Sequence, residues 1–350
     1  MRKLLFPLLL LLGVFFVIGR FTELESVINT LKRADPRFLL MALGVQALWF
    51  LNAGLNLWWI YRALGLTESP WRLALLSLAA SFANVVAPAG GMSGMVLYVS
   101  EAQRQRYSAA RATVASVLYF LSEYLGFLAV LVLGIVVLVR RNNLHPTEVV
   151  ASILMALLAL GLATLLYLGM RSAEQFGRAL AFLARAVNAL LFPFLRRPYL
   201  SEERAHHFAR DAGEGLQGLR QRPRVLIISA LLGLISKALL ILVLVLSFHA
   251  YQVPYSPGTI VAGFCIAYLF LIISPTPAGI GVVEGLLTVG LNSLYVPLSK
   301  AAVVALTYRA VTFWLPLLAG PLAYRLVAYL QGPNASPPSP SDGPSTPNSW

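Results

Sequence analysis

Hydrophobic residues make up 58% of this 350-residue chain and charged residues only 12%, the mean hydropathy is +0.75, and the formal net charge is +13. Soluble domains carry about 25% charged residues, so this composition excludes an ordinary soluble domain. The basic residues are spread over many loops without a nucleic-acid-binding motif, which indicates an orientation signal in a membrane protein and no nucleic-acid partner. We therefore expect an all-α polytopic integral membrane protein.

The first apolar run, residues 4–19, follows a basic start, and the next residues, "RFTELESV", offer no small-residue cleavage site. We interpret this run as an uncleaved first membrane helix rather than a signal peptide. Apolar runs of about 20 residues are long enough to cross a bilayer. Further runs of this kind occupy 38–61, 112–139, 149–170, 225–248 and 301–324.

Two shorter apolar segments, 73–87 and 258–273, each end in a break rich in proline and glycine. At about 1.5 Å per residue, the short apolar arm that follows each break cannot cross about 30 Å of hydrocarbon. We therefore expect residues 73–100 and 258–297 to form re-entrant helical hairpins, each leaving the membrane on the side that it entered.

Lys and Arg are concentrated in the loops that are cytoplasmic if the N-terminus is cytoplasmic, above all in 171–224. The positive-inside rule then predicts cytoplasmic N and C termini. Within that loop, Phe176, Leu180 and Leu183 recur at helical spacing, which favours a cytoplasmic helical hairpin on the lipid headgroups, with a docking platform for a partner as the alternative. The Pro/Ser-rich residues 331–350 are predicted to be a disordered tail.

The two broken segments resemble each other: "NVVAPAGGMSGMVLY" and "IISPTPAGIGVVEGLL" both place Pro-Ala-Gly after an apolar run. Each half of the chain has three expected crossings, an odd number that turns the second copy upside down. We therefore predict an inverted repeat of residues 1–140 and 149–330. Broken backbone at membrane depth must line a cavity or be buried in protein. The alternatives are a transport site and simple kinks between packed helices, and two breaks in register favour the transport site.

Four ionisable residues fall within apolar surroundings: Glu123, Lys237, Glu284 and Arg309. A charge at the centre of a bilayer costs about 2.5–3.5 kcal/mol even on insertion scales, so such residues are usually paired or functional. One interpretation is two structural ion pairs, Glu123–Lys237 and Glu284–Arg309. The other is that the four residues line a central cavity and bind a charged or zwitterionic headgroup.

The stretch "SPTPAGIGVVEG", followed by Arg309, resembles the second signature of the lysylphosphatidylglycerol synthase transmembrane (flippase-like) family, and "APAGGMSGMVLYVSEAQR" resembles the first. The likeness covers roughly residues 5–330. Many members carry Gly-Glu in the first signature, where this sequence has Gly94-Met95. The resemblance implies that the substrate-binding positions include Glu284 and Arg309 together with Pro88, Gly90, Gly91, Gly94, Pro277, Gly279 and Gly281, in addition to Glu123 and Lys237 proposed above from their apolar surroundings.

The family resemblance further implies a flippase-like protein of the bacterial inner membrane that moves a lipid headgroup between leaflets. In the multiple peptide resistance factor, such a domain is joined to a synthase, but this sequence contains no soluble segment of that size or nucleotide-binding motif. We therefore expect no enzyme activity, cofactor or metal, and a phospholipid or another anionic or zwitterionic lipid as partner. The alternatives are an ion-coupled transporter of small solutes, and a non-transporting partner of a lipid-modifying enzyme. A homo-oligomer is also compatible with the sequence.

Overall fold

The computed structural model describes residues 21–86, 92–140, 146–172, 174–182, 222–274 and 276–329, with single residues at 185, 209, 212, 213, 216 and 219. Throughout this part of the chain the regular structure is helical, and it contains no strand. Several predictions fall outside the described residues: the first span at 4–19, most of the 171–224 hairpin, the tail at 331–350, and Pro88, Gly90 and Gly91 of the first break.

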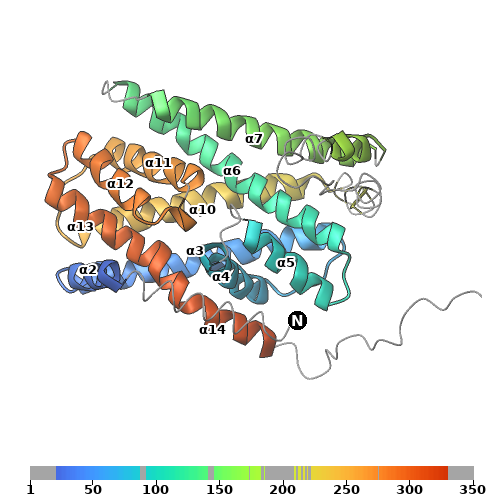
Figure 1. Cartoon of the computed structure of the whole chain (residues 1–350), viewed down its shortest axis with the longest axis horizontal. Coiled ribbons are helices and arrows are strands. Elements are labelled where there is room, and N and C mark those ends of the chain that lie inside the picture. The colour runs from blue at the N-terminus through green and yellow to red at the C-terminus, as the bar shows by residue number, and fades with distance from the viewer. Residues whose placement is uncertain are drawn as a thin grey trace, which may run out of the picture.

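Besides a short helical stretch at 174–182, the described residues form the helical segments arranged as in Figure 1. They are α2 (Phe21–Leu31), α3 (Pro36–Ala63), α4 (Pro70–Val86), α5 (Met92–Arg104), α6 (Ala109–Arg140), α7 (Pro146–Arg171), α10 (Arg224–His249), α11 (Pro257–Ile273), the 3-10 turn η1 (Pro277–Gly279), α12 (Val282–Ser293), α13 (Leu298–Arg309) and α14 (Leu315–Tyr329). One π-helical turn, η2 (Ala310–Trp314), joins α13 to α14.

Four described helices are long and apolar enough to cross a membrane: α3, α6, α10 and the continuous helix Leu298–Tyr329. They contain the predicted spans 38–61, 112–139, 225–248 and 301–324, and the predicted span 149–170 lies within α7. Helices α4, α11 and α12 are apolar but shorter. The chain is therefore a helical membrane protein, and the apolar side chains exposed on its long helices, such as Val132 and Leu133, suit a lipid environment.

Local sequence signals define where the helices begin. Asp35 precedes α3, and its carboxylate accepts a hydrogen bond of 2.9 Å from the backbone N–H of Arg37. Ser256 does the same for α11, accepting from the N–H of Thr259 at 3.1 Å. Each cap is followed by a proline at the first helical position, where the missing N–H leaves no intrahelical bond unmade.

The helices pack in a reciprocal pattern. Helices α3 and α10 lie against each other, α6 packs on α11, and α14 packs on α4. One apolar core joins α6 with α10 to α13, a second joins α3 to α6, and a third surrounds Phe82, Ile280 and Trp314. The two broken segments, α4–α5 and α11–η1–α12, therefore face the centre of the same bundle.

Candidate functional site

The second break, between α11 and α12, has left-handed backbone conformations and is hydrogen-bonded by one arginine. Ala278, Gly279 and Gly281 have φ angles of 50°, 72° and 76°, and this region suits glycine because a Cβ is crowded there. Arg309 of α13 donates from Nη2 to the carbonyl of Ala278 and from Nε to Glu284 Oε1, both at 2.8 Å. A single guanidinium thus fixes the break and the first turn of α12.

Glu284 lies in that first turn of α12, where the positive end of the helix dipole favours a carboxylate. Its partner Arg309 is only 4% exposed, and the guanidinium also lies 4.5 Å from the centre of the Phe313 ring in the π-helical turn. Turns of this kind are often found at functional sites. Pro277 and Gly279 form η1 itself, and Gly281 is the N-cap of α12.

The first break brings α4 and α5 into close contact. The N–H of Gly94, in the first turn of α5, donates a hydrogen bond of 2.6 Å to the Asn84 side chain of α4. A Cβ at Gly94 would lie 2.9 Å from Asn84 Nδ2 and 3.2 Å from the Ala80 Cβ, so glycine permits this approach. Asn84 is a functional candidate that the sequence pattern did not single out.

The crossing of α6 and α10 holds the other pair of charges. Lys237 is fully buried, and its Nζ donates to Glu123 Oε2 at 2.6 Å and to the Tyr268 hydroxyl at 2.5 Å. Ser236 donates to the same Glu123 oxygen at 2.9 Å, and Trp49 donates to the Ser236 hydroxyl at 2.8 Å. Glu123 is thereby held by donors from α10 and kept beside a positive charge.

A cavity of about 590 Å³ lies between these features. Its lining includes Asn84 and Gly94 of the first break, Thr276 and Ala278 of the second, Glu123 of α6 and Arg309 of α13. Lys237 and Glu284 are not among its lining residues. Both ion pairs that the sequence suggested are formed. In each pair one member, Glu123 or Arg309, lines the cavity, and its partner lies behind it, outside the lining.

The family described as the lysylphosphatidylglycerol synthase TM region matches residues 4–320 of the chain. The chain belongs to this family. The match confirms the resemblance seen in the two signatures, and it concerns the membrane region, which is the non-catalytic part of the synthase. No curated protein matches the chain.

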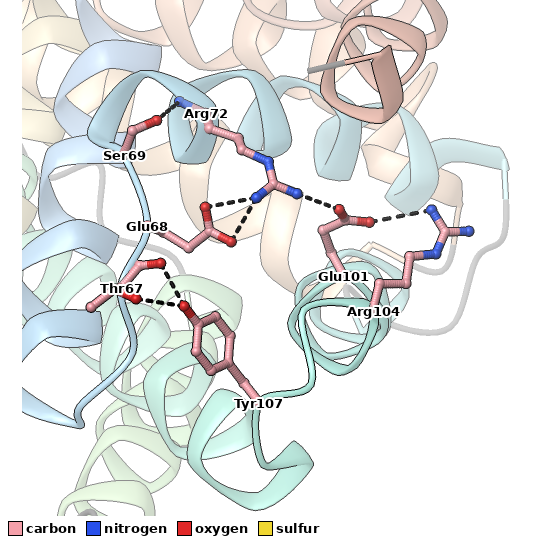
Figure 2. Close-up of polar contacts among 7 residues, drawn as sticks. All are labelled: Thr67, Glu68, Ser69, Arg72, Glu101, Arg104 and Tyr107. Atoms are coloured by element: carbon pink, nitrogen blue, oxygen red, sulfur yellow. Dashed lines mark hydrogen bonds and ion pairs between the residues drawn. The ribbon is translucent and has the colours of Figure 1, made fainter. Parts of the chain in front are cut away.

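In this member of the lysylphosphatidylglycerol synthase TM region family, a second charged cluster lies outside the central cavity (Figure 2). Arg72 at the start of α4 binds both carboxylate oxygens of Glu68 at 2.8 Å and Glu101 of α5 at 2.7 Å. Arg104 completes the cluster with a 3.3 Å bond to Glu101. The cluster ties the beginning of α4 to the end of α5.

Sequence reasoning did not single out the contact between Arg72 and Glu101, although Glu101 is just 3% exposed. The pairs Glu68–Arg72 and Glu101–Arg104 have the four- and three-residue spacings of neighbours on a helix, which was the available signal. Burial raises the pKa of the Glu68 carboxyl above its ordinary value, and the charge of Arg72 opposes that rise.

Proposed function

We propose that this protein moves a lipid headgroup between the two leaflets of the bacterial inner membrane through its central cavity. The observation that carries the proposal is that an acidic residue, Glu123, and a basic residue, Arg309, both line the wall of a cavity between two broken segments. A volume of about 590 Å³ falls within the range of ligand-binding pockets, roughly 300–1,000 Å³.

The energetics of the charges support a functional role. An ion pair buried in a dry interior gains little net stability over an apolar pair of similar size, because desolvation offsets most of the attraction. Two such pairs at one cavity are therefore poorly explained by stability alone. Glu123 Oε1 and Glu284 Oε2 also have no hydrogen-bond partner among the described residues, so each carboxylate retains an accepting atom.

We further propose that α4–α5 and α11–α12 are re-entrant hairpins. The Arg72–Glu101 ion pair ties the outer ends of α4 and α5 together, as expected if both arms open on one side of the membrane. In the second hairpin, Gly263 of α11 approaches Leu291 of α12, which likewise brings the start of one arm to the end of the other. Helices α5 and α12 have 13 and 12 residues, and at about 1.5 Å per residue neither crosses about 30 Å.

The reciprocal packing supports an inverted repeat. The last helix of each half, α6 or α14, packs on the first hairpin helix of the other half, α11 or α4, while α3 and α10 pair with each other. A pseudo-two-fold axis in the membrane plane would produce this reciprocal packing of each half on the other. Transport sites of inverted repeats lie at the interface between the two copies. The orientation that we propose has both termini in the cytoplasm.

The test is a leaflet-specific assay with the full chain in liposomes that carry trace lipids with a fluorescent headgroup and are quenched from outside by dithionite. We expect the protein to make inner-leaflet lipid accessible faster than in protein-free vesicles. Glu123→Gln should slow this by about tenfold or more, since a hydrogen bond to a charged group is worth about 1.5–3 kcal/mol. The control is Lys300→Gln, an exposed charge far along α13 from the cavity.

Rates equal to those of empty vesicles for anionic, zwitterionic and polyprenyl lipids alike would refute the proposal. The two unpartnered carboxylate oxygens also suit a proton- or cation-coupled transporter of a small solute. Uptake of a soluble solute driven by an imposed pH or Na⁺ gradient, without any lipid movement, would favour that second candidate.

A further inference from the structure

An apolar hollow lies beside the central cavity, and we call it the α3–α4–α14 groove. It has a volume of about 260 Å³, and every residue that lines it is apolar except Gln46. The apolar lining includes Leu43, Ala47 and Leu51 of α3, Leu75 and Leu78 of α4, and Leu315 of α14. No charged side chain of the described helices lines it.

A smaller hollow of about 190 Å³ shares lining residues with both the groove and the central cavity. Gln46 and Phe50 line both the groove and the smaller hollow. Trp49, Ser81 and Arg309 line both the smaller hollow and the central cavity. The charged site at Arg309 and the apolar space between α3, α4 and α14 therefore both border the smaller hollow.

Gln46 stands where the polar lining changes to apolar lining. It is only 2% exposed, and its Oε1 has no hydrogen-bond partner among the residues that the structure describes. A buried amide oxygen without a hydrogen-bond partner is unfavourable, and such an atom calls for an explanation. Because an amide can present either its oxygen or its nitrogen, Gln46 suits the glycerol and ester region of a lipid, which joins a polar headgroup to an apolar chain.

The outer end of the groove carries a residue that is typical of a membrane interface. Trp71 lines it and is 59% exposed, and tryptophan is enriched at membrane interfaces. The next residue, Arg72, belongs to the charged cluster of Figure 2. From Trp71 to Leu78, α4 rises about 10 Å. With Trp71 placed at the interface, the groove would extend about 10 Å into the hydrocarbon, a depth at which an acyl chain of one leaflet lies.

We infer that the α3–α4–α14 groove holds one acyl chain of the lipid whose headgroup enters the central cavity, with Gln46 at the ester linkage. The inference rests on the proposed function and adds where the lipid remains attached to the bilayer. An acyl chain gains no hydrophobic free energy by moving from lipid into an apolar groove. The groove therefore guides the chain by its shape, and chain length should affect transport little.

Photolabelling of the full chain in liposomes tests this inference, with phosphatidylglycerol carrying a diazirine in mid-chain as the probe. We expect the label on the groove residues of α3 and α14. Ala47→Trp should fill the groove and lose most of that label, and Ala47 is exposed, so the larger side chain does not overpack a core. The matched control is Leu48→Trp, since Leu48 is 53% exposed and does not line the groove.

Label spread evenly over the exposed faces of the long helices, or label unaffected by Ala47→Trp, would overturn the inference. A groove that stays unlabelled, because residues 1–20 or a second copy of the chain cover it, would also overturn the inference. Headgroup translocation without groove labelling would refute the groove and leave the proposed function standing. Groove labelling without translocation would support the groove and refute the function.

Discussion

Lys237 has no exposed surface, and its ammonium group lies between the Glu123 carboxylate and the Tyr268 hydroxyl, 4.3 Å from the centre of the Tyr268 ring. All of these contacts favour its charged form. Because Lys237 does not line the cavity, we assign it a positioning role: it holds Glu123 in place, and Glu123 meets the cavity. Glu284 plays the corresponding part for Arg309, with the sign of the charges reversed.

Removing the Lys237 ammonium should therefore damage the fold. We expect Lys237→Met to lower the apparent melting temperature in detergent strongly, because stripping one partner from a buried ion pair costs about 3–5 kcal/mol. The double variant Glu123→Leu with Lys237→Met should recover much of the loss, since no unpaired charge is then left buried. Intrinsic fluorescence during heating measures both, with the exposed Lys300→Met as control. A Lys237→Met protein as stable as the wild type would contradict this role.

At the scale of helices, two glycines make the Glu123–Lys237 pair possible. A Cβ at Gly233 of α10 would collide with the carbonyl group of Ser122 in α6, and a Cβ at Gly126 would collide with that of Gly233. The two helix backbones therefore touch at this crossing. Glu123 and Lys237 each lie about one helical turn from this crossing, which explains how two side chains 114 positions apart in the sequence come together.

A matched pair of substitutions tests the crossing. Gly233→Ala should destabilise the protein by about 1–3 kcal/mol, the usual cost of overpacking, because the atoms that it meets belong to backbone. Gly44→Ala in α3 meets nothing within 4 Å and should be neutral or stabilising by up to about 1 kcal/mol through helix propensity. Apparent melting temperatures of the two variants provide the measurement, and equal effects would show that the crossing is not tight.

Four of the long helices could be predicted from the sequence because an apolar run of sufficient length determines a membrane helix almost alone. The sequence could not decide whether the buried charges form ion pairs or line a cavity. That outcome depends on how the helices cross, which no local sequence pattern encodes. Asn84 and the Arg72–Glu101 bond were missed for the same reason. The π-helical turn after Arg309 was also missed, because 301–324 looks like one uninterrupted span.

At the scale of the whole molecule, the reciprocal packing of α6 on α11 and of α14 on α4 makes the two halves interdependent. In the proposed repeat, each hairpin is covered by the last helix of the other half, so neither half would enclose the cavity by itself. The lining draws on both proposed halves, with Asn84 and Glu123 from the first and Thr276 and Arg309 from the second. A motion of one half against the other would therefore change both walls of the cavity together.

The inverted repeat that we propose makes a prediction about sidedness. In a Cys265→Ser background, single cysteines at Ser69 and Gln103, at the outer ends of the first hairpin, should react with a membrane-impermeant maleimide only from the cytoplasmic side. Cysteines at Gln252 and Ser299, at the outer ends of the second hairpin, should react only from the opposite side, because an odd number of crossings inverts the second copy. All four positions are exposed, so each reports the side on which it lies.

Labelling of intact cells and of inverted vesicles provides the two measurements, and the buried position Ala112 serves as an unreactive control. Opposite sidedness for Ser69 and Gln103 would mean that α4 and α5 together cross the membrane, and it would refute a re-entrant first hairpin. The same side for all four cysteines would keep both hairpins but refute the inversion. Only the pattern of two cytoplasmic and two external cysteines agrees with an inverted repeat whose broken segments enter from opposite faces and meet at Glu123 and Arg309.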